Sequence, residues 1–433
     1  MREKYIIPQK KRKLVPGKVF WPFILLTSCF AWWGVANNMT DTLLAAFKRI
    51  MSMSDFQTSW IQIAFYGSYF CLALPAAIFI KKFTYKAGVL LGLGLFVSGA
   101  LLFYPASLTM NYFHFLIALY ILAGGLSILE TSANPYIIAM GPEETGTQRL
   151  NLAQSFNPIG SIMGVFLSKW FILSQLNQSS AQERAAMSAS QLNEIQSTEL
   201  KAVMGPYVAV AFLLLLVWIA IALLKMPKGS DESKKLKLWS TFRRLIGIRH
   251  YRWGVVAQFF YVGAQIGVWS FTIRYVMQEL QINEERAATY YLAALILFTI
   301  CRFISTWLMR FMIPAMLLFL IAVLAMGFTL IVIFASSYVG VYALVAISGC
   351  MSLMFPTIFG LSVRGLGEDT KIGGSGLIMA ILGGAVLTAI QGKVSDAFNS
   401  IHLAYFVPFV CFIIIAAYAL MAWKKNKSIS QEG

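Results

Sequence analysis

The sequence predicts an all-α polytopic membrane protein with twelve transmembrane helices in two pseudo-symmetric six-helix bundles. Three observations carry this prediction. The 433 residues are 58% hydrophobic with a mean hydropathy of +0.70, which is more apolar than a soluble domain of this size. The apolar residues gather in long segments, and the positive charges gather in the short loops between them. The two halves also carry glycine and proline at corresponding places.

Each apolar segment is long enough to cross a bilayer as a helix, because about 20 residues span the hydrocarbon core. We expect twelve spans, at residues 19–47, 56–80, 87–105, 111–139, 149–174, 205–225, 253–278, 287–309, 313–335, 339–362, 373–396 and 401–423.

Loop charge predicts the orientation. With an even number of spans, both termini lie on one side, and most lysines and arginines fall in the regions on that side. The regions predicted to face outward hold only Lys48, Arg49, Lys169, Arg184, Lys201, Arg286 and Lys393. Because basic loops stay in the cytoplasm, we expect cytoplasmic N- and C-termini. The net charge of +17 therefore indicates membrane topology and gives no reason to expect a nucleic-acid partner.

These spans define the expected domain organisation. The parts are a cytoplasmic tail (1–18), an N-terminal bundle (19–225), a cytoplasmic linker (226–252), a C-terminal bundle (253–423) and a second cytoplasmic tail (424–433). The linker is polar and basic. It is either a solvated connection or includes an amphipathic segment on the membrane surface.

Weak internal similarity relates the two halves. GPEET at residues 141–145 follows the fourth span, and GEDTK at 367–371 follows the tenth. Pro135 in the fourth span has a counterpart in Pro356 in the tenth. Repeated halves with helices interrupted by glycine and proline are typical of alternating-access transporters, whose sites lie near the midplane between the halves. For most of the glycines, close helix packing is an equally simple explanation.

Polar residues interrupt two apolar spans. The first span carries Asn37, Asn38, Thr40 and Asp41 within five residues, and the fourth carries LETSANP at residues 129–135. A carboxylate in hydrocarbon costs about 2.5–3.5 kcal/mol on insertion scales, so it must face the protein interior or a wet cavity. One reading is a packing network of polar side chains. The other is a site for a hydroxyl-rich solute and a proton, and the presence of two such stretches favours it.

Asp41 and Glu130 are the candidate proton-coupling residues. A proton carrier needs a carboxyl group that exchanges its proton near neutral pH, and burial favours the neutral form. Glu130 could instead form a structural ion pair with a buried arginine, and Arg302 in the eighth span is the candidate partner, because a buried arginine must also be paired. The two roles of Glu130 can coexist.

The seventh span carries a polar and aromatic stripe. Gln258, Tyr261, Gln265 and Trp269 follow steps of three and four, so they share one helical face that should line a cavity. Amides suit vicinal hydroxyls, and an indole offers a flat surface to the C–H face of a sugar. Core packing or a place in the interfacial belt is the alternative for Trp269. The sugar-binding candidates are Trp33, Asn37, Asn38, Glu130, Asn134, Asn157, Gln258, Tyr261, Gln265 and Trp269.

The fifth span has its own polar repeat, in which Asn151, Gln154 and Asn157 recur every three residues. Asn157 lies deepest in the membrane. For Asn151 we favour simple solvation at the helix end.

No enzymatic or nucleotide-binding signature is present. The sequence has no phosphate-binding loop that ends in Lys-Ser/Thr and no metal-ligand cluster, so we expect no enzyme activity, no cofactor and no metal. Transport energy must then come from an ion gradient or from substrate flow. A proton is the simplest coupling ion, and sodium stays open because Asp, Asn and Thr oxygens can coordinate it.

Five motifs together resemble the fucose permease group of the major facilitator superfamily, the bacterial L-fucose:proton symporters. The similarity extends over nearly the whole chain, and the second motif alone is shared with carriers of glucose, galactose or N-acetylglucosamine. The motifs are WGVANNMTD (33–41), LETSANP (129–135), RLNLAQSFN (149–157), AQFFYVGAQ (257–265) and PTIF (356–359).

The resemblance implies the major facilitator fold and proton-coupled import of a monosaccharide. It also implies that Asp41 is mainly a proton site, that Glu130 couples the proton to the sugar, and that Asn157 lies in the sugar pocket. One departure matters: Met354 and Phe355 stand where the family pattern has Gln-Tyr. The loss of an amide and a hydroxyl there could change which sugars are preferred.

We therefore expect a monomeric, proton-coupled sugar symporter in the inner (plasma) membrane of a bacterium, with L-fucose as substrate and the lipid bilayer as its surroundings. A symporter for another hexose, such as galactose, glucose or N-acetylglucosamine, is the alternative within transport. A sugar sensor or receptor that binds without transport is the alternative from another class. The lack of a recognisable signalling domain in the sequence argues against it.

Overall fold

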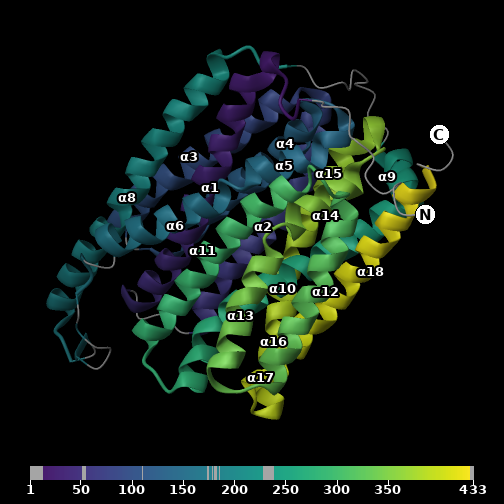
Figure 1. The fold of residues 1–433 in the computed structure, drawn as a ribbon. Coiled ribbons are helices and arrows are strands. Elements are labelled where there is room, and N and C mark those ends of the chain that lie inside the picture. Colours follow the sequence, from purple (N-terminus) through teal and green to yellow (C-terminus); the bar gives the residue numbers. More distant parts are fainter. Residues whose placement is uncertain are drawn as a thin grey trace. The chain divides into compact units, whose positions relative to one another are not determined.

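The computed structural model describes residues 13–50, 55–109, 111–172, 175–177, 179, 183–184, 186–227 and 238–429. Within these ranges the side chains of residues 37, 40–49, 55–60, 62, 169 and 425–429 are not described. Almost all described residues are helical, and eleven helices in this part of the chain are long and apolar enough to cross a membrane (Figure 1). The predicted all-α membrane fold is therefore confirmed.

The chain divides into two compact units, which are described separately. The first unit consists of residues 21–133 and 156–228. Its helices are α1 (Phe20–Ile50), α2 (Asp55–Lys82), α3 (Tyr85–Thr109), the first part of α4 (Tyr112–Ala139), α6 (Asn157–Leu167) with a π-helical turn (Ser168–Ile172), and α8 (Ala189–Leu223).

The second unit consists of residues 1–20, 134–155 and 229–433. It holds the end of α4, α5 (Gly146–Gln154), α9 (Leu238–Gly247), α10 (Arg249–Leu280), α11 (Glu284–Leu308), α12 (Pro314–Phe334), α13 (Ser337–Met351), α14 (Met354–Val363), α15 (Thr370–Met379), α16 (Gly383–Phe398), α17 (Ile401–Ala404) and α18 (Phe406–Ile429). In this unit α10 packs along α16 and α18, and α12 packs along α13 and α18.

Long helices are the only way for most of these segments to satisfy their backbone in hydrocarbon. Their ends carry ordinary start signals. Ser188 and Gln191 form a capping box at α8, and the Asn283 side chain accepts a hydrogen bond from the Arg286 amide at α11. Pro314 opens α12 at a position where its missing N–H has no consequence.

Two of the predicted spans are interrupted just before a proline. The fifth span consists of α5 and α6 with the π-helical turn, separated at Ser155 and Phe156. The tenth consists of α13 and α14, separated at Ser352 and Leu353. Each break precedes a proline, Pro158 or Pro356, which lacks the N–H that would continue the helix. Pro135, by contrast, lies inside the continuous helix α4.

Segment α5 belongs to the same compact unit as the C-terminal helices, and polar side chains hold it there. Gln148 Nε2 donates to the Thr306 carbonyl (3.0 Å). Asn151 Nδ2 donates to the Thr147 carbonyl (2.9 Å) and to Thr357 Oγ1 (3.2 Å). The expectation that Asn151 is solvated is wrong, because the side chain is fully buried against α14.

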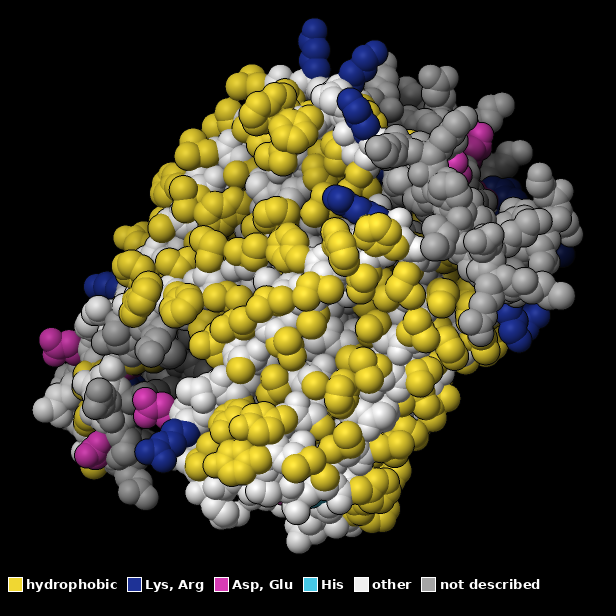
Figure 2. All heavy atoms as spheres, viewed as in Figure 1, with side chains coloured by type: hydrophobic (Ala, Val, Ile, Leu, Met, Phe, Trp, Pro, Cys, Tyr) yellow, Lys and Arg dark blue, Asp and Glu magenta, His cyan; other side chains and the backbone are white. Residues whose placement is uncertain are grey.

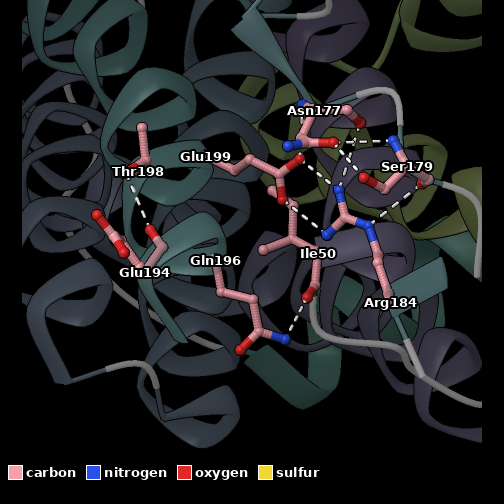
Figure 3. A network of polar contacts seen from close by, with 8 residues as sticks. All are labelled: Ile50, Asn177, Ser179, Arg184, Glu194, Gln196, Thr198 and Glu199. Atoms are coloured by element: carbon pink, nitrogen blue, oxygen red, sulfur yellow. Dashed lines mark hydrogen bonds and ion pairs between the residues drawn. The ribbon is translucent and has the colours of Figure 1, made fainter. Parts of the chain in front are cut away.

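The segment before α8 is fixed by a buried ion pair (Figure 3). Arg184 binds both carboxylate oxygens of Glu199, at 2.9 and 2.5 Å, and these contacts raise the pKa of Arg184. The Asn177 amide donates to the same carboxylate (2.8 Å), and Gln196 Nε2 donates to the Ile50 carbonyl at the end of α1 (2.6 Å). These contacts attach Asn177 and Arg184 to α8, and α8 to the end of α1.

The surface agrees with a lipid environment. Apolar side chains cover most of the face seen in Figure 2, and charged side chains gather at its edges. Large apolar residues such as Trp170, Leu223 and Phe334 are more than half exposed. So much exposed apolar area is a liability in water but is ordinary in hydrocarbon.

Close contact between α1 and α6 gives the first prediction. A Cβ at Gly34 would lie 2.8 Å from the Ser161 backbone nitrogen and 2.9 Å from the Asn157 carbonyl carbon. Gly34→Ala should therefore force the helices apart and reduce stability by about 1–3 kcal/mol, seen as a lower Tm of the detergent-solubilised protein.

Gly205→Ala in α8 is the matched control, because no described atom lies within 4 Å of its added Cβ. Alanine there should leave the Tm unchanged or raise it slightly, by up to about 1 kcal/mol in stability. Equal effects of the two substitutions would contradict the contact.

Candidate functional site

A carboxylate without a partner lies in the middle of α4. Glu130 is 1% exposed, and neither of its oxygens has a hydrogen-bond partner among the described residues. The hydroxyls around it are occupied elsewhere, since Ser127 donates to the Tyr69 carbonyl (3.1 Å) and Thr131 to the Ser127 carbonyl (2.8 Å). An ionised carboxylate in such a place is costly. Glu130 can therefore hold a proton or accept hydrogen bonds from a bound solute.

Two further polar groups lie near Glu130 in the same unit. The Tyr69 hydroxyl is beside the Trp33 indole and within electrostatic range of Glu130. Both the Tyr69 oxygen and Trp33 Nε1 are buried, and neither has a hydrogen-bond partner in the described part of the chain. Sequence reasoning found Trp33 but missed Tyr69. Its sequence signal is weak, because Tyr66 and Ser68 also place hydroxyls in this span.

The glycines of α1 and α6 bring Asn157 to the same helix that carries Trp33. Gly160 lies so close to α1 that a Cβ there would lie 3.0 Å from Ala31 Cα. Asn157, the first residue of α6, donates from Nδ2 to the Phe30 carbonyl (3.2 Å) and is half-buried. Asn38 is also half-buried, one turn after Gly34.

Asn37 and Asp41 lie within helix α1, but their side chains are outside the described part of the structure. Their expected roles in sugar binding and proton coupling stay predictions.

In the second unit, Asn134 is bound on one side only. Its Oδ1 accepts a hydrogen bond from Gln154 Nε2 (2.9 Å), while its Nδ2 has no described partner. Asn134 follows Glu130 by four residues, so both side chains leave the same face of α4. The amide donor of Asn134 is thus available to a ligand.

In the polar and aromatic stripe on α10, some side chains are hydrogen-bonded to the protein and others are not. The Tyr261 hydroxyl donates to the Met351 carbonyl (3.0 Å), and Trp269 Nε1 donates to Ser348 Oγ (3.2 Å). Gln258 is fully buried, and neither atom of its amide is bonded to a described residue. Gln265 is half-buried. Of the stripe, Gln258 has the free donor and acceptor that a hydroxyl-rich ligand needs.

Met354 and Phe355, the two residues that differ from the family pattern, lie close to this stripe. Met354 is fully buried and Phe355 is 8% exposed. The Phe355 ring meets the Tyr261 ring edge-on, with centroids 6.2 Å apart. The position that lacks a hydroxyl is therefore adjacent to a candidate sugar-binding helix.

Arg302 binds the two broken helices. Its Nε donates to the Ser352 carbonyl (2.5 Å), its Nη1 donates to the Gln154 carbonyl (3.0 Å), and its guanidinium lies over the Phe298 ring (4.6 Å). In a continuous helix these two carbonyls would accept from residues 356 and 158, which are both proline. One side chain therefore serves the two carbonyls that the prolines leave without a partner. The pairing of Arg302 with Glu130 stays a prediction.

The chemistry of the site is binding and proton exchange. Carboxylate, indole N–H, hydroxyl and amide groups that have no partner among the described residues can bind a hydroxyl-rich solute. Among the described residues, no three His, Cys, Asp or Glu side chains lie close enough together to hold a metal ion.

Comparison with known proteins identifies similar chains. Residues 23–376 match the family described as Major Facilitator Superfamily. The chain is 40% identical over 424 residues to an L-fucose-proton symporter of Haemophilus influenzae, covering 95% of this chain and 99% of that one. It is 42% identical over 403 residues to the L-fucose-proton symporter of Escherichia coli, covering 92% of each. A solved structure of a variant of the Escherichia coli fucose:proton symporter FucP matches with a TM-score of 0.88 at 41% identity, covering 93% of this chain and 98% of that one.

Two tyrosines provide a prediction about the site. Tyr69→Phe removes a hydroxyl that has no hydrogen-bond partner among the described residues, so it should leave the Tm nearly unchanged. If the hydroxyl binds the transported solute, the same change should raise the KM for uptake roughly three- to tenfold, the value of one hydrogen bond.

Tyr261→Phe is the matched control, because its hydroxyl bonds to the Met351 carbonyl. It should lower stability by about 1 kcal/mol. A Tyr69→Phe variant that loses stability but keeps its KM would contradict the assignment.

Arg302 gives a second prediction. Arg302→Met leaves two buried carbonyls without a donor and should lower stability by about 2–5 kcal/mol. In a Pro356→Ala background, the new N–H at position 356 can donate to the Ser352 carbonyl. The same substitution should then cost at least about 1 kcal/mol less in a double-mutant cycle of unfolding.

A Pro314→Ala background serves as the control, because Pro314 begins α12 and frees no carbonyl. There the cost of Arg302→Met should be unchanged. Strict additivity of Arg302→Met and Pro356→Ala would exclude the proposed role of the guanidinium.

Proposed function

This chain belongs to the Major Facilitator Superfamily and, within it, to the bacterial L-fucose–proton symporters; from that premise we propose that it imports L-fucose with a proton by alternating access. The relatives with this activity align over nearly the full length of the chain. The observation that carries the proposal is Glu130, a buried carboxylate with no described partner in the middle of a membrane helix.

In the proposed cycle, Asp41 and Glu130 are protonated as sugar binds from outside. Protonation neutralises the two carboxylates. The loaded carrier can then change to the state open to the cytoplasm with a smaller free-energy cost than a carrier with charged carboxylates. Release of the sugar and of the protons follows on that side. Glu130 couples the two ligands, because its protonated carboxyl can donate a hydrogen bond to a sugar hydroxyl and accept one from it while carrying no charge.

The residues proposed for sugar recognition carry indole, hydroxyl and amide groups. Trp33 offers an N–H and a flat apolar surface to the sugar's C–H face. Tyr69, Asn134 and Gln258 offer donors or acceptors that have no described protein partner. Asn37, Asn38, Asn157, Tyr261, Gln265 and Trp269 are proposed to complete or support the pocket. In this account the protein performs no covalent chemistry.

The bundle boundaries, membrane and orientation are part of the proposal. Two six-helix bundles, 19–225 and 253–423, would function as a monomer in the bacterial inner membrane. The basic regions at residues 81–86, 243–252 and 424–427 support cytoplasmic termini.

Transport of another hexose is a second candidate, and one observation favours it. Met354 and Phe355 place apolar groups beside Tyr261, where the family pattern has an amide and a hydroxyl. A site that lacks a hydrogen-bonding group discriminates differently among sugars. Competition of labelled L-fucose uptake by D-galactose, D-glucose and N-acetylglucosamine separates the two candidates. Sugar binding without any uptake would instead support a sensor.

The central test separates exchange from accumulation. Glu130→Gln should still exchange labelled for unlabelled L-fucose across the membrane of proteoliposomes. It should not accumulate the sugar under an imposed proton gradient, because the amide cannot carry the proton. We expect the same of Asp41→Asn, with sugar binding retained.

Glu284→Gln is the matched control, because this exposed glutamate lies in the first turn of α11. It should accumulate sugar normally. Undiminished accumulation by Glu130→Gln would remove Glu130 from the coupling mechanism.

A further inference from the structure

A groove lies at the predicted cytoplasmic end of the second unit. It is formed by the N-terminus of α10, the C-terminal part of α18 and the loop after α14, and its volume is about 830 Å³. Three of its lining side chains are basic, namely Arg249, His250 and Lys424, and four are apolar, namely Ile248, Ala417, Leu420 and Met421. The groove is thus cationic at one end of α18 and apolar along the preceding turns.

The electrostatics of this groove favour an anion. None of its lining residues is acidic. Glu143 accepts a hydrogen bond from the backbone amide of the lining residue Gly365 (3.0 Å). The N-cap residue of α10 is Ile248, and no side chain caps the helix there. The positive end of the helix dipole therefore adds to the charge of the basic side chains. His250 is positioned by the Arg364 carbonyl, which lies 3.1 Å from its Nε2.

The helix that leads into the groove is amphipathic. On α9, Thr241 and Leu245 are buried, and the large apolar residues Trp239, Phe242 and Ile246 are exposed. Arg244 fixes the helix through an ion pair with Asp369 (2.8 Å), which raises the pKa of Arg244.

A helix with an exposed apolar face and basic neighbours is typical of the membrane interface. Because α9 ends one residue before Ile248, this interface reaches the groove itself. The amphipathic segment considered for the linker is therefore present within residues 238–247.

We propose that the groove binds an anionic phospholipid of the cytoplasmic leaflet. The phosphate lies among Arg249, His250 and Lys424, and an acyl chain follows Ala417, Leu420 and Met421 along α18. Basic pockets between membrane helices on this side are suited to such headgroups. The apolar lining selects a lipid over a free phosphate, because an inorganic ion would leave that surface uncovered. This site is separate from the transport mechanism proposed above.

Native mass spectrometry of the full-length, detergent-solubilised protein tests the proposal. Dioleoyl phosphatidylglycerol and dioleoyl phosphatidylcholine are added separately, and the retained lipid adducts are compared. The protein should retain phosphatidylglycerol in clear preference. The double variant R249Q/K424Q should weaken its retention roughly ten- to thirtyfold, the loss expected for two basic residues that contact an anionic headgroup.

Two control pairs locate the effect. R249K/K424R keeps both charges and should keep the preference. K82Q/R310Q removes two exposed charges from the same predicted side, outside the groove, and should also keep the preference.

Equal retention of the two lipids by the unmodified protein would overturn the proposal, and this comparison needs no variant to fold. Equal loss of phosphatidylglycerol retention in R249Q/K424Q and K82Q/R310Q would also overturn the proposal. It would show that the lipid responds to the overall charge of this side and not to a defined site. Displacement of the lipid by inorganic phosphate would contradict the role of the apolar lining.

Discussion

The structure depends on one constraint: inside hydrocarbon there is no water to satisfy a polar group, so each must find its partner in the protein. Most do. Hydroxyls such as those of Ser127 and Thr131 bond to carbonyls, and Tyr261 and Trp269 bond to α13. Against this background the exceptions are informative. Polar atoms of Glu130, Trp33, Tyr69 and Gln258 are buried in the membrane part of the chain without a described partner, which is what groups that bind an exchanging ligand require.

The same constraint explains Arg302. A proline inside a membrane helix removes a donor, and the carbonyl four residues earlier must be satisfied by something else. Two spans in corresponding halves contain this arrangement, and one guanidinium satisfies both carbonyls. The fifth and tenth spans can thus be interrupted without leaving these two carbonyls unsatisfied. The interruption places Asn157 at the start of α6 and Met354 at the start of α14.

Much of the fold follows from hydropathy and loop charge, because hydrocarbon permits few alternatives to a helix. Glu130 was found for the same reason, since a carboxylate is conspicuous in an apolar span. The fifth span was predicted as one helix, and sequence alone did not show that Pro158 would divide it while Pro135 would leave α4 continuous. The partners of Arg302 are two backbone carbonyls, which carry no sequence signal. Tyr69 was missed because one hydroxyl in an apolar span has no periodicity.

The central claim is that L-fucose and a proton cross the membrane together. The most direct measurement is external pH in a weakly buffered suspension of energy-depleted cells that express the protein, after addition of L-fucose. The account predicts that the medium becomes alkaline on addition of L-fucose, and less so or not at all with other hexoses, because each sugar takes up a proton from outside. Uptake of labelled L-fucose without any change in external pH would contradict proton coupling.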